Sequence, residues 1–339
     1  MKTLFRILFV LFCVGCSGGD NNIFKIIEKP DLAEINLTCH DSIILPNVSN
    51  VWYWKFDNNR LYTFSAQNPD VHFLSIYSCP DFKLLYKYGT IGQGSDEFIT
   101  VNWANTYNKN EIVLYDIMKK KLYPFKVSDS LVKKMNTFNL AKIKGEKLAK
   151  PFTMVHQIND SIFLMKVNMP DSITLEIADL KNNRQISSYT RLPQVKDIKR
   201  GLLSFLYDFE LEYRDNAIVC AFKSIDRIEI LQIDDEYNIT HKLTIGSKKL
   251  PTEYIRDSDG GHSSFYTDIK CNGKYIFAVC QDKKNKSTIE IYDLEGNGIS
   301  KLCLDHYVEI IFISPDSNYI YAYYQLVNYD VILKYEIPK

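Results

Sequence analysis

The residues of this chain that could do chemistry are polar side chains placed along short apolar segments. Asp208, Glu210 and Glu212 alternate with Phe209 and Leu211, so all three carboxylates can share one face of a strand. Carboxylates grouped with histidine or asparagine can hold a divalent metal ion that activates water. Polar side chains that pair with one another or with water are the alternative interpretation. The candidate ligand-binding residues, all expected near one mouth of a channel, are Trp52, Asn102, Thr153, His156, Asp208, Glu210, His262 and Asp268.

The familiar catalytic signatures are missing from the sequence. It contains no G-x-S-x-G, no H-E-x-x-H and no Walker loop. Residues 257–264 combine two carboxylates with His262 and could bind a cation such as Ca²⁺, but they lack the fuller spacing of an EF-hand loop. A solvated loop is the alternative. We therefore expect no catalytic residues, no metal site and no cofactor, and we favour a non-catalytic binding module. A metal-dependent hydrolase or lyase that uses channel carboxylates is the alternative function.

Three glycines, at positions 89, 92 and 94, are spaced like part of a dinucleotide-binding loop. No helix is expected after them that could present its amide groups to a phosphate. The segment is therefore predicted to be a turn that joins two structural units.

One short pattern recurs six times and indicates how the chain is organised. A turn of Asn, Asp, Gly or Ser is followed at once by an apolar run rich in β-formers, at intervals of about fifty residues. A strand-built repeat of this length predicts an all-β, six-bladed β-propeller with four-stranded antiparallel blades. The six copies lie at residues 58–62, 109–113, 159–163, 215–219, 272–276 and 316–320.

The sixth unit supplies only three strands, at 308–314, 319–325 and 330–337. A strand candidate at 35–45 precedes the first unit and has no unit of its own. We expect this N-terminal strand to complete the last blade and close the ring, which protects the sheet edges from pairing with other chains.

Long connections are expected between the outermost strand of one blade and the innermost strand of the next. In a propeller these connections all emerge on one face, around the mouth of the channel. Function usually lies on loops that a rigid scaffold positions. This face is therefore the predicted binding surface, and its connections are residues 89–100, 141–151, 191–204 and 246–264.

The start of the chain is typical of an export signal. Lys2 and Arg6 precede a short apolar run at residues 7–14, and Gly15 and Cys16 follow it. The run is too short to span a bilayer. Cys16 is the expected site of lipid attachment, because Gly15 and Cys16 resemble the end of a bacterial lipobox; a secretory signal cut nearby is the alternative.

The lipobox resemblance also suggests where in the cell the protein is located. Cys13 departs from the lipobox pattern, in which Leu is usual at this position. Ser17 directly follows the lipidated cysteine, and in this the chain resembles lipoproteins that are sorted to the outer membrane. No later stretch is long and apolar enough to span a membrane. The predicted organisation is a signal peptide at 1–15, a lipidated polar tether at 16–33 and a propeller at 34–339.

The charge balance of the chain argues against one class of partner, and its cysteine content bears on disulfide bonding. The chain has 41 basic and 41 acidic residues and no basic stripe, so nucleic acid is a poor candidate partner. Six of the eight cysteines lie beyond the export signal, at irregular spacing. We expect mostly free, buried thiols; disulfides are the alternative in an exported protein, and no zinc-like spacing occurs.

Two segments carry a resemblance to known families. Residues 312–320 (FISPDSNYI) resemble the S-P-D-G turn of TolB-type and WD40-like propeller blades, and residues 89–98 (GTIGQGSDEF) resemble the G-x-x-G-x-G-x-x-x-F linker of NHL-type propellers. With the lipobox, the chain is similar to the TolB-like six-bladed propeller lipoproteins of Bacteroides and relatives. The resemblance implies the fold and a cell-envelope location. An envelope protein or glycan partner is expected because the predicted chain combines a lipid tether with a rigid ring that carries no recognisable catalytic set. The resemblance implies no particular biochemical activity.

Overall fold

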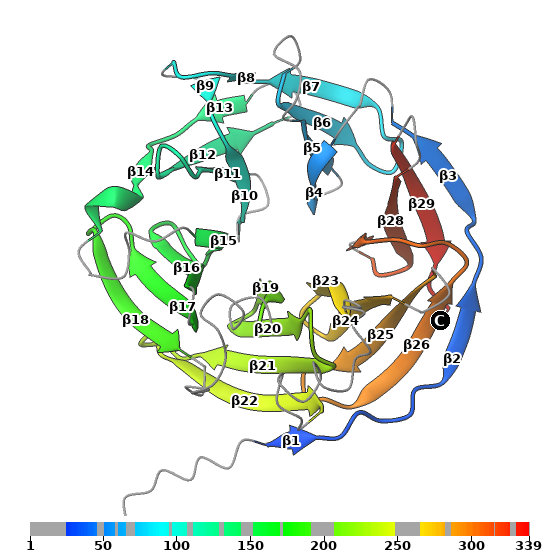
Figure 1. The fold of residues 1–339 in the computed structure, drawn as a ribbon. Coiled ribbons are helices and arrows are strands. Elements are labelled where there is room, and N and C mark those ends of the chain that lie inside the picture. Colours follow the sequence, from blue (N-terminus) through cyan, green and yellow to red (C-terminus); the bar gives the residue numbers. More distant parts are fainter. Residues whose placement is uncertain are drawn as a thin grey trace, which may run out of the picture.

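The strands form a ring of sheets around a central axis (Figure 1). In a β-propeller the innermost strands of such a ring line a central channel. The protein is represented here by a computed structural model. The structure describes residues 25–45, 51–57, 60–65, 72–94, 97–106, 111–128, 132–143, 152–169, 172–190, 207–247, 265–281, 286–314, 316–325 and 330–338.

Each blade is an antiparallel sheet whose first strand lies beside the channel and whose last strand lies at the circumference, as predicted. The strands of the first three blades are β4 (Val51–Asp57), β5 (Arg60–Ser65), β6 (Leu74–Ser78) and β7 (Leu84–Tyr88); β10 (Val101–Asn105), β11 (Glu111–Asp116), β12 (Lys121–Val127) and β13 (Val132–Lys134); and β15 (Phe152–Gln157), β16 (Ile162–Met169), β17 (Ser172–Asp179) and β18 (Arg184–Thr190). Those of the last three are β19 (Phe209–Arg214), β20 (Ala217–Phe222), β21 (Arg227–Ile233) and β22 (Ile239–Gly246); β23 (Tyr266–Cys271), β24 (Tyr275–Gln281), β25 (Ser287–Asp293) and β26 (Gly298–Leu304); and β27 (Ile310–Ile313), β28 (Tyr319–Gln325) and β29 (Asp330–Glu336).

The second and third blades share one continuous sheet. Their innermost strands, β10 and β15, pair in parallel, with Ala104 opposite Val155 and Asn105 opposite His156. This pairing merges the two blades into a nine-stranded sheet, to which β14 (Phe138–Asn139) adds a short strand beside β12. The pairing also determines which residues of β10 and β15 lie at the same height along the axis of the ring.

The hydrophobic core lies between the blades. Six clusters of buried apolar residues each combine residues of two neighbouring blades, and the cluster that contains Trp54 and Tyr323 joins the first blade to the last. The rings of Trp54 and Tyr323 lie 4.4 Å apart, centroid to centroid. Blades need apolar residues on both faces because each packs against two neighbours, which explains the nearly continuous apolar runs of the inner strands.

The N-terminal segment runs along the outer circumference of three successive blades (Figure 1). β3 (Asp41–Ile44) pairs antiparallel with β29 and completes the last blade, as predicted. β2 (Glu34–Leu37) pairs in parallel with β26, and β1 (Ile26–Ile27) pairs in parallel with β22. We call residues 25–45 the N-terminal strap.

Two predictions for this segment are wrong. One continuous strand was expected over 35–45, but the chain turns between β2 and β3, where the Cys39 backbone N–H donates to Asp305 Oδ2 at 3.0 Å. The polar tether was expected to reach residue 33, but pairing with the propeller begins at Ile26. Lys29 adds ion pairs to Asp226 at 2.8 Å and Glu290 at 2.7 Å, so this part of the chain is bound to the rim.

The glycine segment after the first blade is the predicted turn. It contains the paired strands β8 (Thr90–Ile91) and β9 (Glu97–Phe98), and the Gly94 N–H donates to Glu97 Oε2 at 2.7 Å. A Cβ atom on Gly92 would lie 2.0 Å from the same Glu97 oxygen, so the close approach of this carboxylate requires glycine.

The six cysteines in the described part of the chain are free thiols, of which Cys220 and Cys271 are buried and four are partly buried. Among the described residues the only helix is the single 3₁₀ turn η1 (Leu140–Lys142), and no helix is long and apolar enough to cross a membrane.

Candidate functional site

Polar side chains from five innermost strands face one another across the channel. Lys55 on the first blade acts electrostatically on Glu212 of the fourth blade and on His156 of the third. Because these blades lie on different sides of the ring, the interactions run across the channel. We call this set the channel cluster: Lys55, Asn105, His156, Glu212, Asp268 and Lys270.

Asp268 and Lys270 form the best-defined pair of the channel cluster. Lys270 Nζ lies 2.5 Å from Asp268 Oδ1, and the other carboxylate oxygen accepts the backbone N–H of Ile311 at 2.9 Å. Asp268 thereby links the innermost strands of the fifth and sixth blades. Burial lowers the pKa of Lys270, but the carboxylates of Asp268 and Glu212 raise it by more, so Lys270 stays charged.

His156 is a buried, uncharged channel histidine. It is 2% exposed, and its Nδ1 lies 3.2 Å from Asn105 Nδ2. Burial lowers the pKa of His156 to about 3, and the ammonium groups of Lys55 and Lys270 contribute to the shift. This environment fits a histidine whose hydrogen-bonding groups are satisfied by neighbouring residues of the channel, in this case by Asn105.

Glu212 is the carboxyl group of the channel cluster that lacks a direct partner. It is partly buried, and it makes no hydrogen bond or ion pair with any residue in the part of the chain that the structure describes. Burial raises the pKa of Glu212 to about 7, against the lowering effect of Lys270. Its charge therefore changes near neutral pH.

Asp208 and Glu210 share one face of the strand, as the alternation predicts, but lysines bind both. Lys223 Nζ lies 3.0 Å from Asp208 Oδ2 and 2.7 Å from Glu210 Oε1. The buried Lys166 ammonium lies 2.5 Å from Asp208 Oδ1 and also donates to the Phe209 carbonyl. These ammonium groups stand where a divalent cation would have to bind. Within the described ranges, no group of three His, Cys, Asp or Glu residues is arranged to hold a metal ion.

The remaining candidates are not brought into the channel cluster. Asn102 and Thr153 lie near the starts of β10 and β15, whereas Asn105 and His156 lie near the ends of these strands. Thr153 is exposed, and its hydroxyl lies 3.4 Å from Asn168 Oδ1. The side chain of Trp52, and all of His262 and Cys16, lie outside the described residues, as do most of the predicted channel-face connections.

Sequence reasoning missed the lysines. Lys55 lies on β4, Lys270 lies on β23 and Lys223 directly follows β20. Nothing local in the sequence relates Lys55 or Lys223 to the carboxylates that they face or bind. One signal was present: Asp268 and Lys270 alternate along β23 in the same way as Glu210 and Glu212 along β19.

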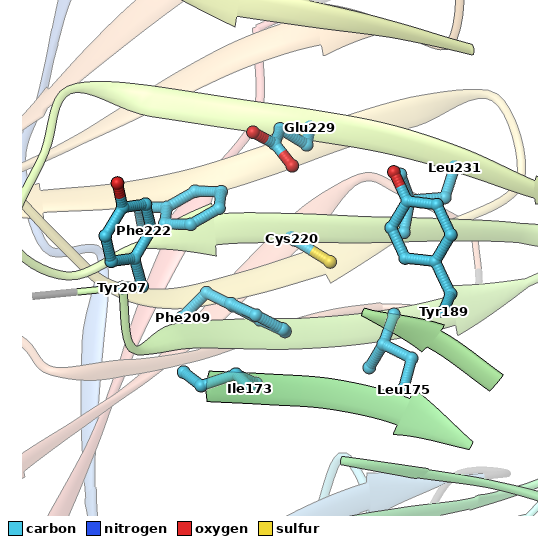
Figure 2. Close-up of a pocket in the computed structure, with 9 residues that line it drawn as sticks. All are labelled: Ile173, Leu175, Tyr189, Tyr207, Phe209, Cys220, Phe222, Glu229 and Leu231. Atoms are coloured by element: carbon cyan, nitrogen blue, oxygen red, sulfur yellow. The ribbon is translucent and has the colours of Figure 1, made fainter. Parts of the chain in front are cut away.

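A separate small cavity lies between the third and fourth blades (Figure 2). Figure 2 shows the Cys220 sulfur between the rings of Phe209 and Tyr189, with the Glu229 carboxylate at the edge. The volume is about 20 Å³, room for about one water molecule. We regard this cavity as a packing feature of the blade interface.

The closed ring, the four-stranded blades and the polar channel define a β-propeller. Residues 53–316 match the family described as TolB-like 6-blade propeller-like, and the chain belongs to this family. No curated protein matches the sequence.

Two solved structures show the same fold. One is a "Putative exported protein" from Bacteroides fragilis NCTC 9343, with 13% sequence identity, a TM-score of 0.60, and coverage of 93% of this chain and 100% of that chain. The other is the β-propeller domain of Cps50 (Swd1) from Myceliophteria thermophila, with 10% identity, a TM-score of 0.51, and coverage of 89% and 100%.

Proposed function

We propose that this protein is an exported lipoprotein of the cell envelope that acts as a non-catalytic binding module for an envelope protein or glycan. The observation that carries the proposal is that channel carboxylates are paired with lysine ammonium groups. Asp208, Glu210 and Asp268 are each held by a lysine at 2.5 to 3.0 Å. Such neutralised groups build a fixed polar surface, whereas a catalytic metal site needs carboxylates that are available to the ion.

The lipid anchor belongs to this proposal. Its support is the lipobox-like sequence that ends at Cys16 and the fold shared with a Bacteroides protein described as exported. The strap joins the propeller along its circumference, beside β22 and β26. A tether that arrives at the rim leaves both faces and the channel mouths open to a partner. We propose the outer membrane as the location.

The proposed binding surface is the face of the connections between blades. Its described part, around the first of these connections, is rigidly held: Lys119 Nζ donates to the carbonyls of Gly94 at 2.9 Å and Glu97 at 2.7 Å. A preorganised loop loses little conformational entropy when it binds. This suits recognition of a macromolecular partner.

Glu212 favours the alternative function, a hydrolase or lyase. A carboxyl group whose pKa lies at about 7 is suited to proton transfer at neutral pH. Metal analysis of the purified protein separates the two. Stoichiometric Ca²⁺ or Zn²⁺ that is lost in an Asp208→Ala/Glu210→Ala double variant would replace the binding-module proposal with the metal-dependent enzyme.

The proposed function is tested by crosslinked purification of the full-length protein from its own cell envelope, read by mass spectrometry. Cys16→Ala, which cannot be acylated, is the matched control. We expect lipidated N-terminal peptides and one partner in near-equal amount for the native chain, with both lost in the variant. Recovery of the native chain without lipid, or without any stoichiometric partner, contradicts the proposal.

A further inference from the structure

The equal totals of acidic and basic residues conceal a basic segment that builds the outer part of the second blade. Residues 117–143 contain seven lysines, no arginine and one acidic residue, Asp129. The rest of the chain therefore carries six more acidic than basic residues. The segment comprises the turn after β11, then β12, β13, β14 and η1. A chain that is neutral as a whole thus has one strongly basic region.

The fold gathers lysines of this segment at the two ends of β12. Lys120 lies in the turn before β12, and its carbonyl accepts the N–H of Leu140 at 2.9 Å, so Lys142 of η1 follows close to the same turn. At the other end, Lys126 and Lys133 are direct partners on β12 and β13. Direct partners on antiparallel strands have Cβ atoms roughly 5 Å apart. At about 3.3 Å per residue, the two lysine pairs lie roughly 17 Å apart along the blade edge.

These four lysines are exposed and lack close carboxylate partners. Lys120, Lys133 and Lys142 form no ion pair with any residue that the structure describes, and Lys126 is attracted electrostatically to Glu111 on β11. Elsewhere in the ring, lysines lie 2.5 to 3.0 Å from a carboxylate oxygen, as do Lys29, Lys166, Lys223, Lys270 and Lys301. Two ammonium groups directly opposite each other repel and lower stability. An anionic partner removes this repulsion.

Protection of a sheet edge is the alternative explanation, because lysine on an exposed edge discourages pairing with other chains. The strap does not cover the outer edges of the first three blades. The outermost strands of the other two uncovered blades, β7 and β18, each carry one basic residue, Lys87 and Arg184. Edge protection in this ring therefore needs few charges, and it does not account for Lys120 and Lys142, which lie outside the strands.

The composition of the region favours a flexible polyanion over a folded protein. Cores of protein interfaces are enriched in arginine and depleted in lysine. Lysine is a point charge on a flexible stem, which suits repeated anionic groups that have no fixed geometry. The membrane of the proposed anchor is less suited, because the strap reaches the ring at β1, on the opposite side from β12 and β13 (Figure 1).

We propose that the outer edge of the second blade binds an acidic polysaccharide through Lys120, Lys126, Lys133 and Lys142. This inference rests on the proposed binding function and assigns it a glycan rather than a protein. Carboxylate or sulfate groups of the polysaccharide approach the ammonium groups at both ends of β12. Full affinity therefore needs a chain longer than roughly 17 Å. Because the four lysines are exposed, salt screens the attraction and weakens binding.

The test is biolayer interferometry of the full-length protein in detergent, at low and at high salt. The probes are polygalacturonate, which carries carboxylates, and heparin, which also carries sulfates. We expect binding that weakens as the salt concentration rises. Tighter binding of polygalacturonate indicates a carboxylated glycan, and tighter binding of heparin indicates a sulfated one. Digalacturonate, too short to reach both ends of β12, should bind much more weakly than the polymer.

Two double variants decide which residues bind. Lys120→Gln/Lys142→Gln and Lys126→Gln/Lys133→Gln each remove the charges at one end of β12. Each should weaken binding of the preferred polysaccharide by about three- to thirtyfold, the range expected for two exposed charge contacts. Thermal unfolding should match that of the native chain, because all four residues are exposed.

The matched control is Lys181→Gln/Lys274→Gln, which removes as much charge from exposed turns of the third and fifth blades. It should bind like the native chain. Equal weakening by this control shows attraction by net charge alone and overturns the inference. Absence of binding to both polysaccharides also overturns it, as does binding only to phosphatidylglycerol vesicles. Since isolated protein is used, a protein partner recovered from the envelope without polysaccharide binding here overturns this inference and leaves the binding-module proposal standing.

Discussion

At the scale of single residues, the channel is governed by competition between burial and charge pairing. His156 and Glu212 are both surrounded by protein, and burial disfavours the charged form of each. Lys55 and Lys270 add to this effect for the imidazole and oppose it for the carboxyl group. Histidine therefore stays neutral through the physiological range, and Glu212 becomes the group that responds to pH.

The raised pKa of Glu212 predicts a stability change of known sign. A carboxyl group whose pKa is higher in the folded state than in the unfolded chain destabilises the fold as the pH rises from the unfolded value, near 4.3, to the folded value of about 7. We expect Glu212→Gln to melt at a higher temperature than the native chain near pH 8, with the difference vanishing near pH 4. Thermal unfolding by circular dichroism measures both. A difference that is constant with pH, or larger in acid, contradicts the assignment.

At the scale of elements, the turns between the third and fourth strands of three blades use one device. An aspartate at the end of the third strand accepts backbone N–H groups of the turn and the side-chain amide of a following asparagine. The pairs are Asp179 with Asn182, Asp234 with Asn238, and Asp293 with Asn297. This device holds each outer hairpin in register.

Replacing one of these aspartates should weaken the fold moderately. Asp293 accepts from the N–H groups of Glu295 at 3.0 Å and Asn297 at 2.8 Å, and from Asn297 Nδ2 at 2.7 Å. We expect Asp293→Ala to lower the free energy of unfolding by about 1–2 kcal/mol. Glu295→Ala, in the same turn, removes only an exposed ion pair to Lys242 and should cost below about 1 kcal/mol. Urea unfolding compares the two; equal losses would show that the turn bonds are unimportant.

Besides strand pairing, the strap is held by a partly buried ion pair between Lys29 and Glu290. Lys29 lies 2.7 Å from Glu290, whose side chain is 8% exposed and also accepts from the hydroxyl groups of Tyr266 and Tyr292. Removal of the ammonium leaves this carboxylate buried without its counter-charge. We expect Lys29→Met to lower the free energy of unfolding by about 2 kcal/mol, less than for a fully buried pair because Lys29 is partly exposed.

The control for Lys29 is Lys301→Met on the same side of the ring. Lys301 pairs with Glu34 at 3.0 Å, but the side chain of Glu34 is 62% exposed. A pair of this kind contributes at most about 1 kcal/mol. If both variants lose the same stability in urea unfolding, Lys29 does not hold the strap as described.

Much of the fold could be predicted because it repeats. Each blade carries the same turn and apolar run, and the shortage of one strand in the last unit correctly indicated an N-terminal closing strand. The break between β2 and β3 could not be predicted, since it depends on Asp305, far away in the sequence. The interaction between the first and fourth blades was hidden for the same reason: Lys55 acts electrostatically on Glu212 only because the ring brings their blades face to face.

At the scale of the whole molecule, the strap and the blade interfaces close one ring. The cluster that joins Phe312 to Trp54 completes the core between the last and first blades, and β3 covers the edge of β29. A propeller without this closure exposes a sheet edge and an apolar interface. The strap also connects the rim to the proposed anchor.

Deletion of residues 25–45 tests the closure. We expect the shortened protein to lose its single cooperative melting transition and to aggregate, because the outer edges of β22, β26 and β29 lose the strap strands that cover them. Size-exclusion chromatography and thermal unfolding measure this. A monomeric product that melts like the native chain would show that the blades close without the strap.

The most direct test of the binding-module account is a crosslink map of the full-length, lipid-anchored protein in its own envelope. The account predicts that crosslinks to one stoichiometric partner gather on the face of the inter-blade connections, near Lys119, and are sparse at the rim positions Lys25 and Lys242. Crosslinks confined to the rim, or no partner in stoichiometric amount, would contradict it.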